Sequence, residues 1–391
     1  MTTSSGPCLG GLPGRLENAS RRPASLGTTP AGCVSLAIGE PYGGTPAPIV
    51  EAAVTALGHG RTGYAPLTGN PDLRDGVAAD LGGGLSAANI VLTHGASAGL
   101  AAVILALVDA GDRVVIPEPT YSLYADHVAL VGGQIVWTAN HPDGRLDLDR
   151  LADELPGARM VVICNPGNPT GRIYPAPDVR ALIEMAAAAG AWVLVDEAYR
   201  DLVFDDTPMT SAVSMMCAAD NVMVCGTFSK SFAMTGWRLG WVAAPPRAAA
   251  AINLVHRSIN GALNTFVQDA GLAALALPAD HLRIMLAGYR QRRDLVMAML
   301  GDLETVTLAP PQGAFYAFPR IAGCTDSRSL TADLATAGVV VRAGWEFGPS
   351  GEGHVRLSFA TDLDSLRTGL DRVRNHLEAR QSWPGRRSEP V

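Results

Sequence analysis

Short apolar runs alternate with longer amphipathic stretches through most of the chain. Six of these runs are expected to be strands: residues 90–92, 113–116, 134–137, 160–164, 192–195 and 222–225. Most are continuously apolar, which is typical of strands covered by helices on both faces. Helical patterns lie between them, for example over residues 96–108 and 178–189. We therefore predict an α/β domain over residues 46–275, with a mainly parallel central sheet between helices.

The pattern changes beyond residue 280. A long amphipathic helix is predicted over residues 281–300, and shorter strands within residues 313–319, 339–342 and 355–359. Residues 280–380, together with residues 33–45, are expected to form a smaller α+β domain. Residues 1–32 and 381–391 are rich in turn formers and lack periodicity, so we expect a partly mobile N-terminal arm and a flexible tail.

Composition narrows the class of protein. The chain has 391 residues, of which 48% are hydrophobic and 17% charged, enough for a large core. A net charge of -7 without a basic stripe argues against a nucleic-acid partner. The longest apolar stretch, residues 96–110, is too short to cross a bilayer, and the N-terminal residues lack the apolar segment of a secretory signal. We predict a cytoplasmic protein without membrane association.

The six cysteines include no CxxC pair and no histidine at metal-binding spacing. We therefore expect reduced thiols and no metal site.

Lysine usage is more informative, because Lys230 is the only lysine beside 29 arginines. A GC-rich genome explains the arginines. The remaining primary amine is nevertheless a candidate covalent residue, since a guanidinium stays protonated and cannot condense with a carbonyl.

Polar motifs follow three of the predicted strands. They are residues 165–171 (NPGNPTG), 196–199 (DEAY) and 226–240 (GTFSKSFAMTGWRLG). The carboxyl ends of parallel strands lie at one edge of an open α/β sheet, where ligands bind. We therefore expect their asparagine, aspartate, tyrosine and lysine side chains to meet at one rim.

Together these motifs resemble those of fold type I pyridoxal-phosphate enzymes of the class I/II aminotransferase family, in the subgroup around bacterial aspartate aminotransferases. The resemblance extends from residues 35–41 (SLAIGEP) to residues 355–360 (VRLSFA). It implies the fold of the type I PLP-dependent transferases, pyridoxal 5'-phosphate as cofactor, and amino acid and 2-oxo acid substrates.

The resemblance also implies catalytic roles. Lys230 matches the residue that holds the cofactor as an imine and then moves a proton during the reaction. Asp196 matches the carboxylate that faces the pyridine nitrogen and favours its protonated form. Tyr199 and Asn168 match the pair that hydrogen-bonds the phenolic oxygen of the cofactor. The alternatives are an aspartate that caps a strand end and an asparagine that serves a turn.

The same resemblance indicates which residues bind the phosphate group of the cofactor. The start of the helix after residue 95 would offer backbone amides at Ala96 and Ser97 and the Ser97 hydroxyl. Thr227 and Ser229 would add hydroxyls. Arg238 matches the phosphate-binding arginine, whose planar fork suits two hydrogen bonds.

Aromatic residues complete the expected cofactor site. Tyr121 matches the side chain that stacks on the pyridine ring, whereas Tyr124 is expected to pack on the following helix. Tyr64 matches a tyrosine that reaches the phosphate of the neighbouring subunit, which implies a homodimer with shared active sites. The alternative for Tyr64 is an ordinary loop anchor.

Arg356 matches the arginine that binds the substrate α-carboxylate, with a backbone amide of Gly39 and with Asn168 nearby. Holding the carboxylate and the imine together would align the Cα–H bond with the cofactor ring. Arg342 competes for this role, although the motif favours Arg356. By the same resemblance, five residues match positions that line the side-chain pocket and favour an apolar or mixed substrate: Ile38, Tyr42, Phe315, Tyr316 and Trp345.

The leading functional prediction is transamination between an L-amino acid and a 2-oxo acid by a ping-pong mechanism. Other chemistry with the same cofactor remains open: elimination or replacement at the β or γ carbon, cyclisation, or decarboxylation in a specialised pathway. A cofactor-sensing regulator is a remote alternative, because only about 32 loosely patterned residues precede the predicted domains and the chain is acidic.

Overall fold

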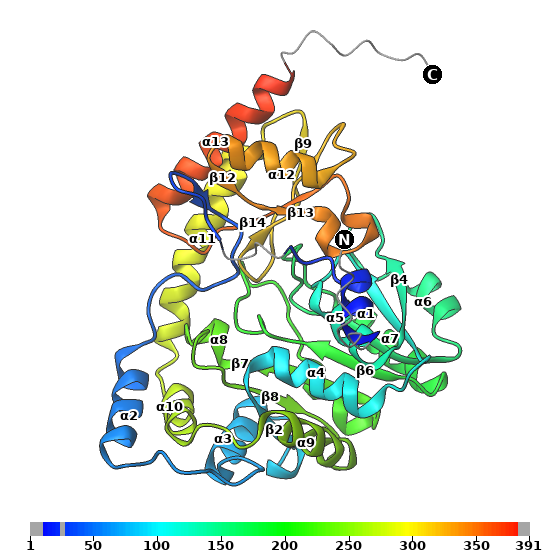
Figure 1. The fold of residues 1–391 in the computed structure, drawn as a ribbon, viewed down its shortest axis with the longest axis vertical. Coiled ribbons are helices and arrows are strands. Elements are labelled where there is room, and N and C mark those ends of the chain that lie inside the picture. The colour runs from blue at the N-terminus through cyan, green and yellow to red at the C-terminus, as the bar shows by residue number, and fades with distance from the viewer. Residues whose placement is uncertain (1–10, 24–27, 382–391) are drawn as a thin grey trace, which may run out of the picture.

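The computed structural model describes residues 11–23 and 28–381. The predicted flexibility of residues 1–10, 24–27 and 382–391 lies outside the described residues. Figure 1 shows a lower body built around a central sheet and an upper body of short strands and helices. The helix α11 (Asp280–Leu300) runs from the lower body into the upper one.

The central sheet has seven strands in the order β2-β8-β7-β6-β5-β3-β4, and all are mutually parallel except β8. Their bounds are β2 Ile90–Thr93, β3 Arg113–Glu118, β4 Gln134–Ala139, β5 Ala158–Cys164, β6 Trp192–Asp196, β7 Val222–Thr227 and β8 Gly240–Ala243. The predicted fold class is thus confirmed. The hydrophobic pattern of the sequence did not predict β8, a four-residue strand that begins with glycine. β8 pairs with β2 on one side and with β7 on the other, and these pairings hold it in the sheet.

Both faces of this sheet are buried, as the continuous apolar runs predicted. Val115, Val161 and Val193 belong to the core on one face. Their strand neighbours Val114 and Val162 belong to the core on the other face. Since successive side chains of a strand point to opposite faces, a strand covered on both sides must be apolar throughout.

Helices cover the sheet and lead to the second body. In the first body they are α2 Ala47–Gly58, α3 Pro71–Leu81, α4 Gly95–Leu107, α5 Leu123–Val131, α6 Leu148–Glu154, α7 Ala176–Ala188, α8 Phe228–Ser231, α9 Pro246–Asn260 and α10 Thr265–Leu275. Short 3-10 helices occupy η1 Ala87–Asn89, η2 Ala212–Ala218, η3 Gly344–Phe347 and η4 Pro349–Gly351.

Within the described residues no single helix is long and apolar enough to cross a bilayer. The helices α10 and α11 would be long and apolar enough only as a pair, and they are bent by 84° relative to each other.

The upper body combines residues from both ends of the chain. The strand β1 (Val34–Ser35) pairs in parallel with β12 (Val339–Val340). The other strands are antiparallel: β9 Val306–Thr307 with β11 Arg320–Ile321, and β10 Tyr316–Ala317 and β13 Arg342–Ala343 on either side of β14 Val355–Ser358. With α11, the helices α12 (Ser327–Thr336) and α13 (Leu363–Gln381) complete it.

The N-terminal segment differs from the loose arm that its composition suggested. Residues Gly11–Ala19 form the helix α1, which lies beside α5. The Arg15 Nε donates a hydrogen bond to the Ala129 carbonyl at 3.2 Å. No residue of α1 is buried, and the helix contains two glycines and a proline. Leu12, Leu16 and Ala19 are spaced for one side of a helix, but the glycines and the proline among them argued against a helix.

Candidate active site

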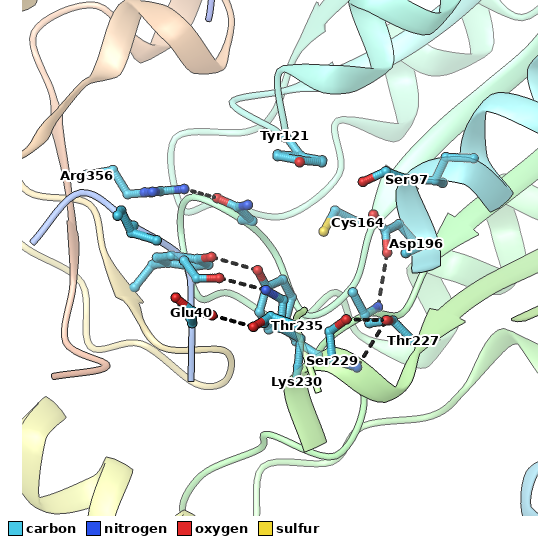
Figure 2. Close-up of a pocket in the computed structure, with 18 of the residues that line it drawn as sticks. Glu40, Ser97, Tyr121, Cys164, Asp196, Thr227, Ser229, Lys230, Thr235 and Arg356 are labelled. Carbon is cyan, nitrogen blue, oxygen red and sulfur yellow. Dashed lines mark hydrogen bonds between the residues drawn. The ribbon is translucent and has the colours of Figure 1, made fainter. Parts of the chain in front are cut away.

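The carboxyl ends of β5, β6 and β7 meet at a cavity of about 330 Å³. All the predicted site residues except Tyr64 line it. Figure 2 shows Asp196 and Thr227 at strand ends and Ser229 and Lys230 on the following α8 around this space, with Arg356 on the side of the smaller body. The fold thus brings together residues that are far apart in sequence, as the strand-end motifs predicted.

Lys230 lies on α8, a single helical turn after β7. Its Nζ donates a hydrogen bond to the Gly39 carbonyl at 2.6 Å. Burial lowers the pKa of Lys230 to about 8, and the positive charge of Arg356 acts in the same direction. Because the neutral amine is the nucleophile, this environment gives Lys230 a far larger reactive fraction near neutral pH than an exposed lysine has.

Asp196, at the end of β6, is nearly fully buried. The Tyr124 hydroxyl donates a hydrogen bond to its Oδ2 at 2.7 Å, and the Ala198 backbone N–H donates to its Oδ1 at 3.0 Å. Burial raises the pKa of Asp196, and these two hydrogen bonds oppose that rise. The buried carboxylate is therefore held in place as a hydrogen-bond acceptor at the floor of the cavity.

Tyr124 lies on α5 and packs in the core, as its sequence suggested, but it also makes a polar contact that the sequence did not predict. It is fully buried, and its hydroxyl donates the hydrogen bond to the predicted catalytic carboxylate. Tyr121 lies just before α5, and its ring meets the Tyr124 ring edge to face, with 5.6 Å between the ring centroids. No pattern in the sequence indicated the hydrogen bond between Tyr124 and Asp196.

Tyr199 and Asn168 both line the cavity, and each is tied to the smaller body. The Tyr199 hydroxyl lies 2.7 Å from the Tyr316 hydroxyl. An Arg356 Nη donates a hydrogen bond to Asn168 Oδ1 at 3.1 Å. The Arg356 guanidinium also lies over the Tyr316 ring, 4.3 Å from its centroid. These contacts join the two bodies of the protein at the cavity.

Arg356 and its competitor Arg342 differ in their partners. Arg342 forms a buried ion pair with Glu346, with Nε donating to Oε2 at 2.7 Å. Arg356 also bonds the Ala37 carbonyl, yet its Nε is buried without a hydrogen-bond partner among the described residues. Burial lowers the pKa of Arg356 to about 10. A buried, incompletely bonded guanidinium is suited to a carboxylate ligand.

The other end of the cavity is built to receive an anion. Ala96 and Ser97 lie in the first turn of α4, where backbone N–H groups lack partners within the helix. Arg238 stands beside this turn, since a Cβ added at Gly95 would lie 2.6 Å from an Arg238 Nη. Thr227 and Ser229 are hydrogen-bonded to each other at 2.9 Å on the same side.

Two predicted aromatic positions have different outcomes. Tyr121 lines the cavity, and Figure 2 shows its ring projecting over the space between Arg356 and Ser97. Tyr64 is 100% exposed and is not a lining residue of this cavity in one chain. A role for Tyr64 in the site would therefore require a second copy of the chain.

The predicted side-chain pocket is only partly assembled at this cavity. Ile38 and Tyr316 line it. Tyr42 lies at a neighbouring surface hollow, Trp345 at another, and Phe315 is fully buried in the core of the smaller body. The hint of an apolar substrate therefore rests on fewer residues than the sequence suggested.

Arg22 is a cavity residue that sequence reasoning missed. Its Nε is buried without a hydrogen-bond partner among the described residues. The segment that carries it is anchored by Arg21, whose guanidinium lies 4.7 Å from the centroid of the Trp345 ring and donates to the Trp345 carbonyl at 3.0 Å. No periodic pattern marks these residues, so only the folded chain places them at the site.

The residues present fit a flat aromatic monophosphate. An anion site lies at one end, a buried carboxylate and an aromatic ring flank the middle, and a reactive amine faces the same space. The unpartnered Nε of Arg356 leaves one further polar group ready for a ligand. This fold and this site together define the class of fold type I pyridoxal-phosphate enzymes.

Comparison with known proteins places the chain more narrowly. The family described as aminotransferase class I and II matches residues 31–373. An aspartate aminotransferase of Pyrococcus horikoshii is 33% identical over 356 residues, covering 88% of this chain and 90% of the relative. An arginine–pyruvate transaminase of Pseudomonas aeruginosa is 34% identical over 348 residues, covering 86% and 88%.

Solved structures agree with the sequence relatives. The aromatic aminotransferase of Pyrococcus horikoshii has a TM-score of 0.86 and 31% identity, covering 95% of this chain and 99% of its own. The chain belongs to the class I and II aminotransferases, a family whose members depend on pyridoxal phosphate. It is an aminotransferase, as the motifs predicted.

Proposed function

We propose that this chain binds pyridoxal 5'-phosphate and transfers an amino group between an L-amino acid and a 2-oxo acid in two half-reactions. The observation that carries the proposal is the placement of the only lysine, Lys230, in one cavity with Asp196 and Arg356. When bound, the cofactor supplies an aldehyde that takes the amino group and a ring that accepts electrons from Cα.

The phosphate group of the cofactor would bind at one end of the cavity. N–H groups, hydroxyls and a guanidinium would hold it there, from the α4 N-terminus, Ser97, Thr227, Ser229 and Arg238. Tyr121 would cover one face of the ring and exclude water from it.

The middle of the cavity would set the electronic state of the ring. Asp196, fixed by Tyr124, would keep a proton on the ring nitrogen, which strengthens the ring as an electron acceptor. Tyr199 and Asn168 would donate hydrogen bonds to the ring oxygen and stabilise its negative charge.

Arg356 and Lys230 would act on the substrate. Arg356 would bind the α-carboxylate through its fork of N–H groups and so fix the orientation of Cα. Lys230, once freed from the cofactor, would take the proton from Cα and return it to the neighbouring cofactor carbon as a general base and acid. The low pKa of its amine suits both directions of transfer.

A half-reaction assay tests the proposed function. The loaded enzyme is mixed with single amino acids, without any oxo acid, and its visible absorbance is followed. We expect at least one L-amino acid to bleach the band stoichiometrically and to yield its 2-oxo acid and pyridoxamine phosphate. Formation of ammonia and a β- or γ-eliminated product in place of these would favour the alternative chemistry.

The lowered pKa of Lys230 predicts how cofactor binding depends on pH. Burial disfavours the ammonium form, so the reactive neutral amine is depleted below about pH 8 and predominates above it. We expect the rate of covalent attachment to the apoenzyme to rise with pH and to level off above about 8. Stopped-flow absorbance measures this rate. A midpoint near about 10.4, the usual lysine value, would contradict the predicted environment.

We further propose that Arg22 offers its charge to an acidic side chain of the substrate, since its Nε is buried and unpaired at the cavity. Arg22→Gln is expected to reduce the preference for aspartate over asparagine, measured as a ratio of kcat/KM, by about tenfold or more. Arg328→Gln is the control, because Arg328 carries the same charge and lies over the Trp345 ring, but does not line this cavity. An unchanged ratio in Arg22→Gln would refute this role.

We also propose that the chain works as a homodimer with shared active sites. Tyr64 is fully exposed, and α2 exposes Val50, Val54 and Leu57, which are 39%, 62% and 45% accessible. Their spacing places them along one side of the helix, as an apolar surface for a second copy. The Tyr64 hydroxyl would then reach the phosphate of the partner.

Subunit mixing tests this sharing. Tyr64→Phe and Lys230→Ala are each expected to weaken cofactor binding as pure proteins. In a mixed dimer, one site combines Lys230 from the first variant with Tyr64 from the second. We therefore expect mixing to restore native affinity to about half of the intact lysine sites, by statistical exchange. No gain on mixing, in proteins shown to exchange subunits, argues that each chain forms its site alone.

A further inference from the structure

We propose that Tyr316 is a positioning residue whose hydroxyl directs the hydroxyl hydrogen of Tyr199 into the cavity, toward the ring oxygen of the bound cofactor. The inference rests on the proposed cofactor but concerns a residue of the smaller body. Tyr316 lies in β10 and is 1% exposed, and its hydroxyl is 2.7 Å from that of Tyr199.

The hydroxyls of Tyr316 and Tyr199 each have one hydrogen to donate, and each can also accept a hydrogen bond. If Tyr316 donates to Tyr199, the hydrogen of Tyr199 is free for an acceptor in the cavity. If Tyr199 donates to Tyr316, only its lone pair faces the cavity. The two arrangements therefore offer opposite groups to a ligand oxygen.

Arg356 favours the first arrangement. Its guanidinium lies 4.3 Å from the centroid of the Tyr316 ring, where a cation withdraws electron density and strengthens the phenol as a donor. Burial raises the pKa of Tyr316, and Arg356 opposes that rise. For Tyr199, burial and then the neighbouring Tyr316 hold the pKa well above its ordinary value, so Tyr199 keeps its hydrogen.

Packing restricts the Tyr316 hydroxyl to this direction. A Cβ added at Gly39 would overlap it, so the Gly39 backbone closes one side of the hydroxyl. Tyr199 lies on another side at hydrogen-bond distance. The same Gly39 carbonyl accepts the Lys230 hydrogen bond. A small movement of Tyr316 would therefore be felt at Tyr199 and at Lys230.

Other charged and titratable groups face this pair and must be considered in any pH measurement. They are Lys230, Arg356, Arg342, Cys164, Tyr121 and Tyr289. Burial raises the pKa of Cys164 to a value at which the thiol stays neutral at any working pH. Changes in visible absorbance near neutral pH in the loaded enzyme would therefore report on protonation of the covalent linkage between the cofactor and Lys230.

The test is a pH titration of the visible absorbance of the loaded enzyme without substrate. A hydrogen bond to the ring oxygen stabilises its negative charge and favours the unprotonated form of the covalent linkage between the cofactor and Lys230. The pKa of this linkage, measured from the pH dependence of the visible absorbance, is called the absorbance pKa below. Tyr316→Phe weakens that bond and should raise the absorbance pKa by about 0.5–1 unit, the effect of one neutral hydrogen bond. The cofactor content should stay stoichiometric.

Two further variants separate positioning from general disturbance. Tyr174→Phe is the control, because Tyr174 is also buried and its hydroxyl accepts from Asn140 Nδ2 at 2.9 Å, away from this cavity. It should leave the absorbance pKa unchanged. Tyr199→Phe should raise that pKa more than Tyr316→Phe does. Adding Tyr316→Phe to Tyr199→Phe should change nothing further, since Tyr316 acts through Tyr199.

The outcomes are distinct. An unchanged absorbance pKa in Tyr316→Phe, or additive shifts in the double variant, would overturn the role of Tyr316 and leave the proposed function intact. A wild-type protein that takes up no cofactor would overturn both. If Tyr316→Phe fails to fold, Gly39→Ala replaces it: the added Cβ displaces the same hydroxyl, so the absorbance pKa should again rise, and no rise would refute the inference.

Discussion

Lys230→Ala is expected to abolish covalent attachment of the cofactor and to lower turnover by about 10⁴-fold or more, because one side chain supplies both the nucleophile and the general base. The chain has no second lysine that could substitute. The phosphate site remains intact, so the variant should still bind the cofactor reversibly. Absorbance spectra with and without desalting, and half-reaction rates, measure the two effects.

Lys230→Arg is the matched control for this experiment. It restores a positive charge near Asp196 and Arg356, but the guanidinium stays protonated and forms no imine. We therefore expect Lys230→Arg to be as inactive as Lys230→Ala. Recovery of turnover in the arginine variant would show that the charge, and not the amine chemistry, is what the site requires.

Arg356→Gln is expected to have the second largest effect, and to act on substrate rather than cofactor. Removing one partner of a buried charge pair costs about 2–5 kcal/mol, so kcat/KM should fall by roughly 30-fold to several thousand-fold. Covalent attachment of the cofactor should persist, since the phosphate residues lie at the other end of the cavity. The pH dependence of the visible band should shift, because Arg356 also contacts Asn168 and Tyr316. Half-reaction kinetics with the best amino acid measure the loss.

A substrate comparison shows whether the lost contact is the one to the α-carboxylate. The wild type should react much faster with an amino acid than with the corresponding amine that lacks the carboxylate. In Arg356→Gln that difference should shrink, because the carboxylate has lost its partner. If both substrates slow by the same factor, the role of Arg356 in binding the carboxylate is wrong.

The predictable part of the fold is the part governed by local pattern. Most of the six predicted strands are continuously apolar, and these are predictable because burial on both faces favours apolar residues at successive positions. β8 is not, since four residues beginning at Gly240 become a strand only through their neighbours β2 and β7. α1 is not, because its stability comes from docking on α5.

The same division applies to the site. Residues in linear motifs at strand ends, such as Lys230 and Asp196, could be assigned to one rim before the fold was known. Arg22 reaches the cavity from a segment without any pattern, and Tyr124 acquires its role from one hydrogen bond across the fold. Such contacts depend on tertiary geometry, which hydrophobic periodicity does not encode.

Reductive trapping tests whether Lys230 is the residue that binds the cofactor covalently. Treating the loaded enzyme with borohydride converts an imine to a stable amine, and peptide mass mapping then locates the bound cofactor. We predict one modified side chain, Lys230, because the sequence has no other lysine. A cofactor that is lost after reduction, or that is found on the N-terminal amine while Lys230 remains unmodified, would contradict the assignment of Lys230 as the covalent residue.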